Sequence, residues 1–120
     1  MDMLGQLASK YPDKFELLDN MSLFSKHCTM KIGYSLYGCN SACGYSIKLI
    51  AYGDIEKRHP RLVDYDGIMY VDFNYDYDDR VIEVTSFDEL EKIALGYEET
   101  ILRIRKRLMK EQRIKMIREL

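Results

Sequence analysis

The stretch SFDELEKIALGYEETILRIRKRLMKEQRIKMIREL, residues 86–120, decides most of the fold. Its first four residues fit a capping box, in which the Ser86 hydroxyl and the Glu89 carboxylate each accept a hydrogen bond from a free backbone N–H group. No proline follows, so the sequence predicts one helix of about 33 residues and about 50 Å, with Gly96 as the expected point of any kink or fraying. The apolar residues recur at intervals of three and four and predict one buried seam: Phe87, Leu90, Ala94, Tyr97, Ile101, Ile104 and Leu108.

Before this helix the apolar residues repeat every second position, which is typical of half-buried strands. Residues 28–37 and 45–52 alternate in this way around a loop rich in Gly, Asn and Ser, and they predict an antiparallel hairpin. Residues 68–75 and 81–84 predict a second hairpin, with the chain turning at residues 76–79.

The rest of the chain is predicted to be helical or irregular. Residues 2–22 predict two short helices, the second beginning at Pro12. Residues 53–66 are polar and contain His59-Pro60, so they predict a connector. We therefore expect a single α+β domain over residues 1–120. It has a four-stranded antiparallel sheet (two hairpins), short N-terminal helices and a long C-terminal helix covering one face of the sheet.

Composition excludes several protein classes. The chain has 120 residues, of which 47% are hydrophobic, and this fraction excludes a disordered chain. No apolar run approaches the roughly 20 residues of a membrane span, and the start Met-Asp-Met-Leu-Gly is not a secretory signal. Three cysteines are too few for a disulfide-stapled secreted domain. These features predict a cytoplasmic protein.

A net charge of −2 hides a strong segregation of charge. Residues 64–91 contain ten acids and one base, whereas residues 103–118 contain eight bases and one acid. Acids near a helix start and bases near its end complement the helix dipole, so part of this pattern needs no partner. The dipole does not explain the acids on the predicted strands.

The leading functional hypothesis places a protein partner on the acidic region. Tyrosines and carboxylates that alternate with buried strand residues should form an exposed face, and such a face suits a partner with a basic groove. Carboxylates on one strand face are about 7 Å apart, near the phosphate spacing of nucleic acid, so the face could mimic phosphates. We therefore expect a small inhibitor of a nucleic-acid-handling complex, similar in type to the anti-defence proteins of phages and mobile elements. The predicted partner-binding residues are Asp64, Asp66, Tyr70, Asp72, Asn74, Asp76, Asp78, Asp79 and Glu83.

The alternative hypothesis is nucleic-acid binding by the basic end of the long helix. Clustered cations neutralise phosphates and give binding that weakens with salt. The residues that would act are Arg103, Arg105, Lys106, Arg107, Lys110, Arg113, Lys115 and Arg118. A basic helix could also dock on the acidic region of a second copy, so a homodimer is a side prediction.

The sequence offers little that is typical of catalysis or metal binding. It contains no glycine-rich phosphate loop, nucleophile elbow, HExxH or CxxC pattern. A zinc site made of His27, Cys28, Cys39 and Cys43 is disfavoured, because the two later cysteines are four positions apart and no second pair follows. A magnesium site in the turn at residues 76–79 would have too few ligands at defined positions. We therefore expect no enzyme activity, no cofactor and no bound metal.

Overall fold

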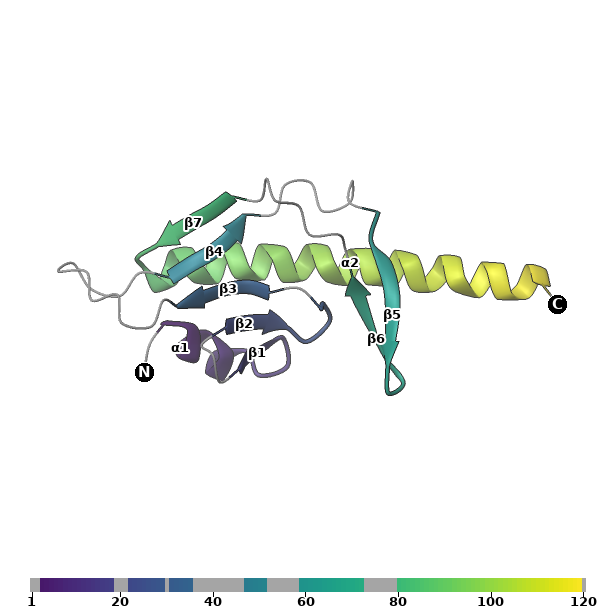
Figure 1. Ribbon diagram of the computed structural model, residues 1–120, viewed down its shortest axis with the longest axis horizontal. Helices are drawn as coiled ribbons and strands as arrows, with labels where there is room; N and C mark the ends of the chain where they lie inside the picture. Colours follow the sequence, from purple (N-terminus) through teal and green to yellow (C-terminus); the bar gives the residue numbers. More distant parts are fainter. Residues whose placement is uncertain are drawn as a thin grey trace.

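The computed structural model describes residues 3–18, 22–29, 31–35, 47–51, 59–72 and 80–119 (Figure 1). These ranges contain two helices, α1 (Met3–Lys10) and α2 (Phe87–Glu119), and seven strands. The strands are β1 (Phe15–Leu18), β2 (Ser22–Ser25), β3 (Lys31–Ser35), β4 (Ile47–Ala51), β5 (Arg61–Tyr65), β6 (Ile68–Asp72) and β7 (Arg80–Val84). All strand pairs are antiparallel, which confirms the α+β class.

The strands form two sheets instead of the single four-stranded sheet that was predicted. The larger sheet has the order β1-β2-β3-β4-β7, and the smaller consists of β5 and β6. The pairing of β3 with β4, with Gly33 opposite Leu49, confirms the first predicted hairpin. The second predicted hairpin is wrong, because β7 pairs with β4 and β6 pairs with β5. The alternating pattern identified these strands correctly but carries no information about which strand lies beside which.

The second predicted N-terminal helix is also wrong. The backbone N–H groups of Lys14 and Phe15 both donate to the Tyr11 carbonyl, so a single turn forms and the chain then enters β1. Strand β1 pairs with β2 along its whole length, and Phe15 and Leu23 are buried in the core. Burial against neighbouring elements therefore overrides the weak helical spacing of this segment. The first predicted helix is confirmed as α1.

The predicted connector at residues 53–66 contains a strand that the sequence analysis missed. Residues Arg61–Tyr65 form β5, and the chain reverses into β6 through Asp66 and Gly67. Both turn residues have positive φ, 54° and 84°, as a two-residue type I′ hairpin turn requires. The Asp-Gly pair is a strong hairpin signal, and it identifies β5 once the flanking residues are read as strands.

Helix α2 agrees closely with its prediction. The Ser86 hydroxyl oxygen accepts the N–H of Glu89 at 3.2 Å, which is one half of the predicted capping box. The helix continues through Gly96 as one element. The seam is confirmed: Leu90, Ala94, Ile101 and Ile104 are buried, and Phe87, Tyr97 and Leu108 are partly buried against them.

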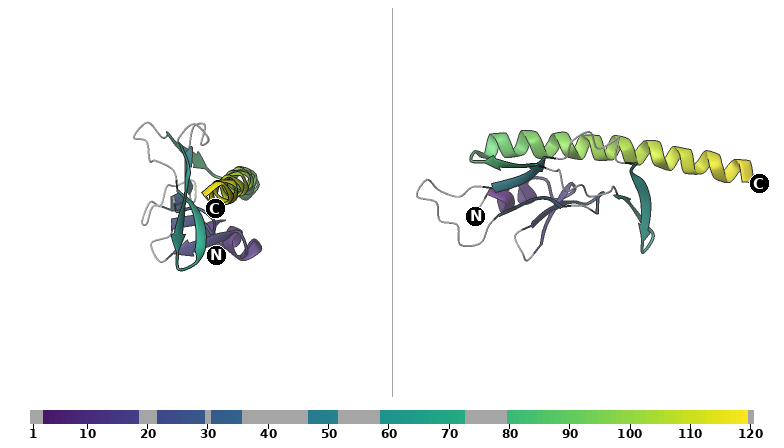
Figure 2. Two further views of the ribbon diagram at one scale, coloured as in Figure 1. Left: turned by 90° about the vertical axis from the view of Figure 1, so that its right-hand side faces the viewer. Right: turned by 45° about the horizontal axis from the view of Figure 1, so that its top comes forward.

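The seam of α2 crosses two separate cores. Its first part packs with α1 against one face of the larger sheet, around Leu7, Leu23 and Ile32. Its second part packs against the β5–β6 hairpin, where Ile101 and Ile104 meet Cys28 and Val71. The helix then runs on beyond the hairpin, as Figure 1 and the right-hand view of Figure 2 show. We call residues 109–118 the arm; all its side chains from position 110 onward are exposed.

Candidate interaction surfaces

The β5–β6 hairpin stands out from the larger sheet (Figures 1 and 2). Its attachment is a short parallel contact with the segment after β2. The N–H of Val71 donates to the His27 carbonyl at 2.8 Å, and the N–H of Thr29 donates to the Val71 carbonyl at 3.1 Å. On the helix side, Arg105 Nε donates to the Met69 carbonyl at 3.0 Å. The hairpin is therefore anchored to the segment after β2 through Val71, near its base, and to α2 through Met69, closer to its turn.

The structure divides the predicted acidic face. Asp64 and Asp66 are exposed at the turn of the hairpin, and Asp64 Oδ1 accepts the N–H of Gly67 at 2.8 Å. Tyr70 lies on the same hairpin and is half-buried. Glu83 is exposed but lies on β7, in the other sheet. The remaining predicted residues Asn74, Asp76, Asp78 and Asp79 lie outside the described residues.

Asp72 stabilises the fold instead of belonging to an open acidic strip. Its Oδ1 accepts the Thr29 hydroxyl at 2.7 Å, and its Oδ2 accepts Arg61 Nε at 3.1 Å. Arg61 is also the residue opposite Asp72 in the β5–β6 register. The carboxylate charge is thus balanced by a neighbouring cation, and the side chain links the hairpin to the segment after β2.

Two apolar residues that were not among the predicted site residues are exposed at the hairpin turn. Tyr65 is 57% exposed and Ile68 is 54% exposed, and they lie opposite each other in the register. The Tyr65 ring lies 5.8 Å from the Tyr70 ring, centroid to centroid. The alternation along β6 puts Val71 on the buried face and Tyr70 on the other face. By the same alternation Ile68 shares the face of Tyr70, so its exposure could have been predicted from the sequence. We call residues 64–70 the hairpin tip.

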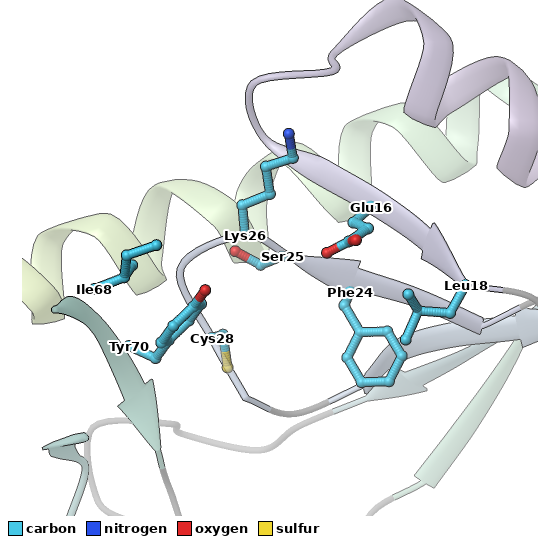
Figure 3. A pocket seen from close by; sticks show the side chains of 8 residues that line it. All are labelled: Glu16, Leu18, Phe24, Ser25, Lys26, Cys28, Ile68 and Tyr70. Atoms are coloured by element: carbon cyan, nitrogen blue, oxygen red, sulfur yellow. The ribbon is translucent and has the colours of Figure 1, made fainter. Parts of the chain in front are cut away.

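A groove of about 480 Å³ separates the hairpin from the larger sheet. Figure 3 shows Ile68 and Tyr70 on one side of it and Leu18 and Phe24 on the other, with Cys28 between them. Its lining includes one acid and one base, Glu16 and Lys26, together with Ser25. The groove is therefore mainly apolar, with no dominant charge of its own.

A buried carboxylate links β2 to α2 close to the base of the hairpin. Glu98 is only 1% exposed, and its Oε2 accepts the hydroxyl of Ser25. Its Oε1 lies 2.8 Å from Nδ1 of His27, which must carry the proton because a carboxylate oxygen only accepts. Nothing in the sequence around residue 98 predicted these partners.

The Ser25, His27 and Glu98 cluster does not have the geometry of a catalytic triad. In a triad the imidazole lies between the hydroxyl and the carboxylate. Here both the hydroxyl and the imidazole bind the carboxylate, and Ser25 Oγ accepts the backbone N–H of His27 at 3.1 Å. The cluster therefore joins β2 to α2 and lacks the bond between hydroxyl and imidazole that defines a triad.

The candidate zinc ligands are not assembled within the described residues. Cys28 is buried in the second core, and the ring of His27 is bound to Glu98. Cys39 and Cys43 lie outside the described residues. No group of three His, Cys, Asp or Glu side chains in the described ranges is placed to hold a metal ion.

The predicted basic residues mostly form a continuous exposed surface on α2. Arg105 is the exception, because it is half-buried and binds the hairpin through the Met69 carbonyl. Arg107 Nε lies 3.9 Å from Glu111 Oε1, one helical turn further along. The exposed bases are Arg103, Lys106, Arg107, Lys110, Arg113, Lys115 and Arg118.

Comparison with known proteins finds no matching family, no matching curated protein and no matching solved structure. Within the described residues, neither α1 nor α2 offers an apolar stretch of the length that a lipid bilayer requires.

Proposed function

We propose that this chain is a non-enzymatic binding module that acts by occupying the surface of a protein partner with its hairpin tip. The observation that carries the proposal is the exposure of Tyr65 and Ile68 beside Asp64 and Asp66, at the turn of a hairpin that stands out from the larger sheet. Exposed aromatic and aliphatic side chains of this kind are typical anchors of protein interfaces.

The charge of the tip indicates the partner. Two carboxylates beside an apolar anchor favour a partner that has a basic surface around an apolar depression. Basic grooves in proteins commonly hold nucleic acid, so a tip lodged in one would exclude the natural ligand. The proposed activity is therefore inhibition of a nucleic-acid-handling complex, as expected of an anti-defence protein of a phage or mobile element.

The test is displacement of a labelled duplex from a panel of purified nucleases and RNA-guided effectors with basic grooves. The double variant Asp64→Asn/Asp66→Asn removes both charges, yet asparagine still accepts the Gly67 N–H and still tolerates positive φ. Its control is Asp13→Asn/Glu99→Gln, which removes two exposed charges from parts of the chain away from the hairpin.

We expect the wild-type chain and the control to displace the duplex from at least one member of the panel, and the tip variant to need at least about tenfold more protein. A Tyr65→Ala/Ile68→Ala variant should lose displacement as well, because it removes the apolar anchor. Equal displacement by wild type and both tip variants would refute the proposal, and so would failure of the wild type on every member of the panel.

Nucleic-acid binding by residues 103–118 is the second candidate function. Seven of the eight predicted bases are exposed, and most of them lie where α2 has passed the hairpin. This surface is positively charged, whereas the hairpin tip is negatively charged, so it would bind an anionic partner.

A further inference from the structure

We infer that the arm binds duplex DNA in the B form by lying in its major groove. The inference rests on the second candidate function and names the class of nucleic acid. It stands on three features of the arm: its isolation from the rest of the fold, the distribution of its cations around the helix, and the side chains that it lacks.

The arm is a helix that is exposed to solvent on all sides. Side chains from position 110 to 118 are all exposed, whereas the root of the arm is fixed by Ile101 and Ile104 in the second core. A helix with its side chains is about 10–12 Å across, and the major groove of B-DNA is about 12 Å wide. Because the root is already ordered, little conformational entropy would be lost when the arm binds.

The cations of the arm are spread around the helix. At 100° per residue, Lys110, Arg113, Lys115 and Arg118 cover an arc of roughly 200°. The exposed apolar residues Ile114, Met116 and Ile117 lie within an arc of roughly 160° that overlaps the arc of the cations, so the arm has no separate apolar and charged faces. A helix lying on a membrane surface needs one apolar face and one charged face. In a major groove, by contrast, phosphates flank the helix on two sides, so the spread of cations matches that environment.

The side chains missing from the arm narrow the choice of nucleic acid. Residues 98–120 contain no aromatic residue and no histidine. Binding of single strands relies on aromatic side chains that stack on the bases. The major groove of A-form RNA is too deep and narrow for a helix to enter, which leaves B-form DNA as the matching duplex.

The hairpin limits how far along α2 the DNA can reach. Arg105 is occupied by its bond to the Met69 carbonyl, so the hairpin lies against this turn of α2. Contact is therefore confined to the arm, which is about 15 Å long. Its four bases correspond to about four neutralised phosphates and a slope near −3.6 for log K against log salt. Between 50 and 200 mM salt the affinity should thus fall about 150-fold.

The experiment measures anisotropy of the full chain with three labelled probes: duplex DNA, duplex RNA of the same sequence, and single-stranded DNA. Arg113→Gln/Lys115→Gln removes two arm cations and keeps good helix formers at both positions. Lys26→Gln/Lys92→Gln removes two exposed cations elsewhere and is the matched control. Circular dichroism of each variant establishes that the helix content is unchanged.

We expect duplex DNA to bind at least tenfold more tightly than the other two probes, and the arm variant to reduce the salt slope by about 1.8 while the control leaves it unchanged. Equal or tighter binding of duplex RNA or single strands would overturn the inference but keep nucleic-acid binding as a function. Absence of binding to every probe at 50 mM salt would overturn both. Equal losses in the control and arm variants would overturn the assignment to the arm.

Discussion

Replacing Ser25 by alanine tests how the buried carboxylate of Glu98 is held between β2 and α2. The variant removes the hydroxyl that donates to Oε2, while His27 continues to donate to Oε1. Glu98 is only 1% exposed, so water has little access to the oxygen that loses its donor. A hydrogen bond to a charged group contributes about 1.5–3 kcal/mol, and we expect the free energy of unfolding to fall by that amount. The melting temperature should fall by about 4 °C for each kcal/mol, or about 6–12 °C.

Replacing Glu98 by glutamine should cost less than removing Ser25. The amide oxygen of glutamine can still accept the Ser25 hydroxyl, and the amide group can bond to His27 if the imidazole takes its other tautomer. The charge-assisted part of both bonds is lost, but so is the cost of several kcal/mol for burying a charge. We expect a net loss of no more than about 1 kcal/mol.

The assay is guanidinium unfolding followed by circular dichroism, with Glu99→Gln as the control for an exposed acid on the same helix. The control should stay within about 0.5 kcal/mol of wild type. The double variant Ser25→Ala/Glu98→Gln should depart from additivity by about 1–2 kcal/mol, because the two side chains share one bond. A Ser25→Ala variant as stable as the control, or strictly additive losses, would refute the reasoning.

Three further predictions concern single sites. Gly67→Ala should lower the free energy of unfolding by about 1–2 kcal/mol in denaturant titrations, because alanine is strained at a φ of 84°. Gly96→Ala should raise it by up to about 1 kcal/mol in the same titrations, since this helical position is exposed and no heavy atom lies within 4 Å of an added Cβ. The hydrogen bond from Lys10 lowers the pKa of Glu91 below 4.5, so its stabilisation is present above that pH and is lost as the pH falls through the lowered pKa. The same bond raises the pKa of Lys10 above 10.5, so the contribution is fully present below 10.5 and is lost as the pH rises through the raised pKa. The stability difference between wild type and Glu91→Gln, measured against pH, should therefore vanish at both extremes.

Helix α2 was predictable because its signals are local and repeated. The capping serine marks its first turn, and seven apolar positions at alternating intervals of three and four define its buried seam. Each interval is independent support for the same face, so an error at one residue does not change the outcome. Gly96 did not interrupt the helix, because the seam on both sides of it is held by packing.

Strand pairing was less predictable because it depends on contacts between distant parts of the chain. A period of two shows which residues of β6 share a face, and it placed Val71 inward correctly. It does not distinguish β5 from β7 as the partner of β6. The deciding signal was the Asp66-Gly67 turn, which makes β5 the immediate partner through a two-residue loop.

The candidate surfaces show the same division between local and long-range information. The clusters of charge along the chain were visible in the sequence, and the structure exposes Asp64 and Asp66 on one turn and most of the bases on one helix. Asp72 and Arg105 have partners 11 and 36 positions away, and the sequence pattern alone did not indicate either contact. Glu98 was missed for the same reason, because its serine partner is 73 positions away.

The two charged surfaces are far enough apart to act independently. From Ile104, which packs against the base of the hairpin, to Lys115 on the arm is 11 residues, or about 16 Å of helix. The Debye length at physiological salt is about 8 Å, so exposed charges at that separation are largely screened from each other. Neutralising Asp64 and Asp66 should therefore leave the affinity of the arm for duplex DNA unchanged at 150 mM salt and strengthen it only at low salt. A strengthening that persists at 150 mM, measured by anisotropy, would instead place the DNA against the hairpin and show that the two surfaces compete for one ligand.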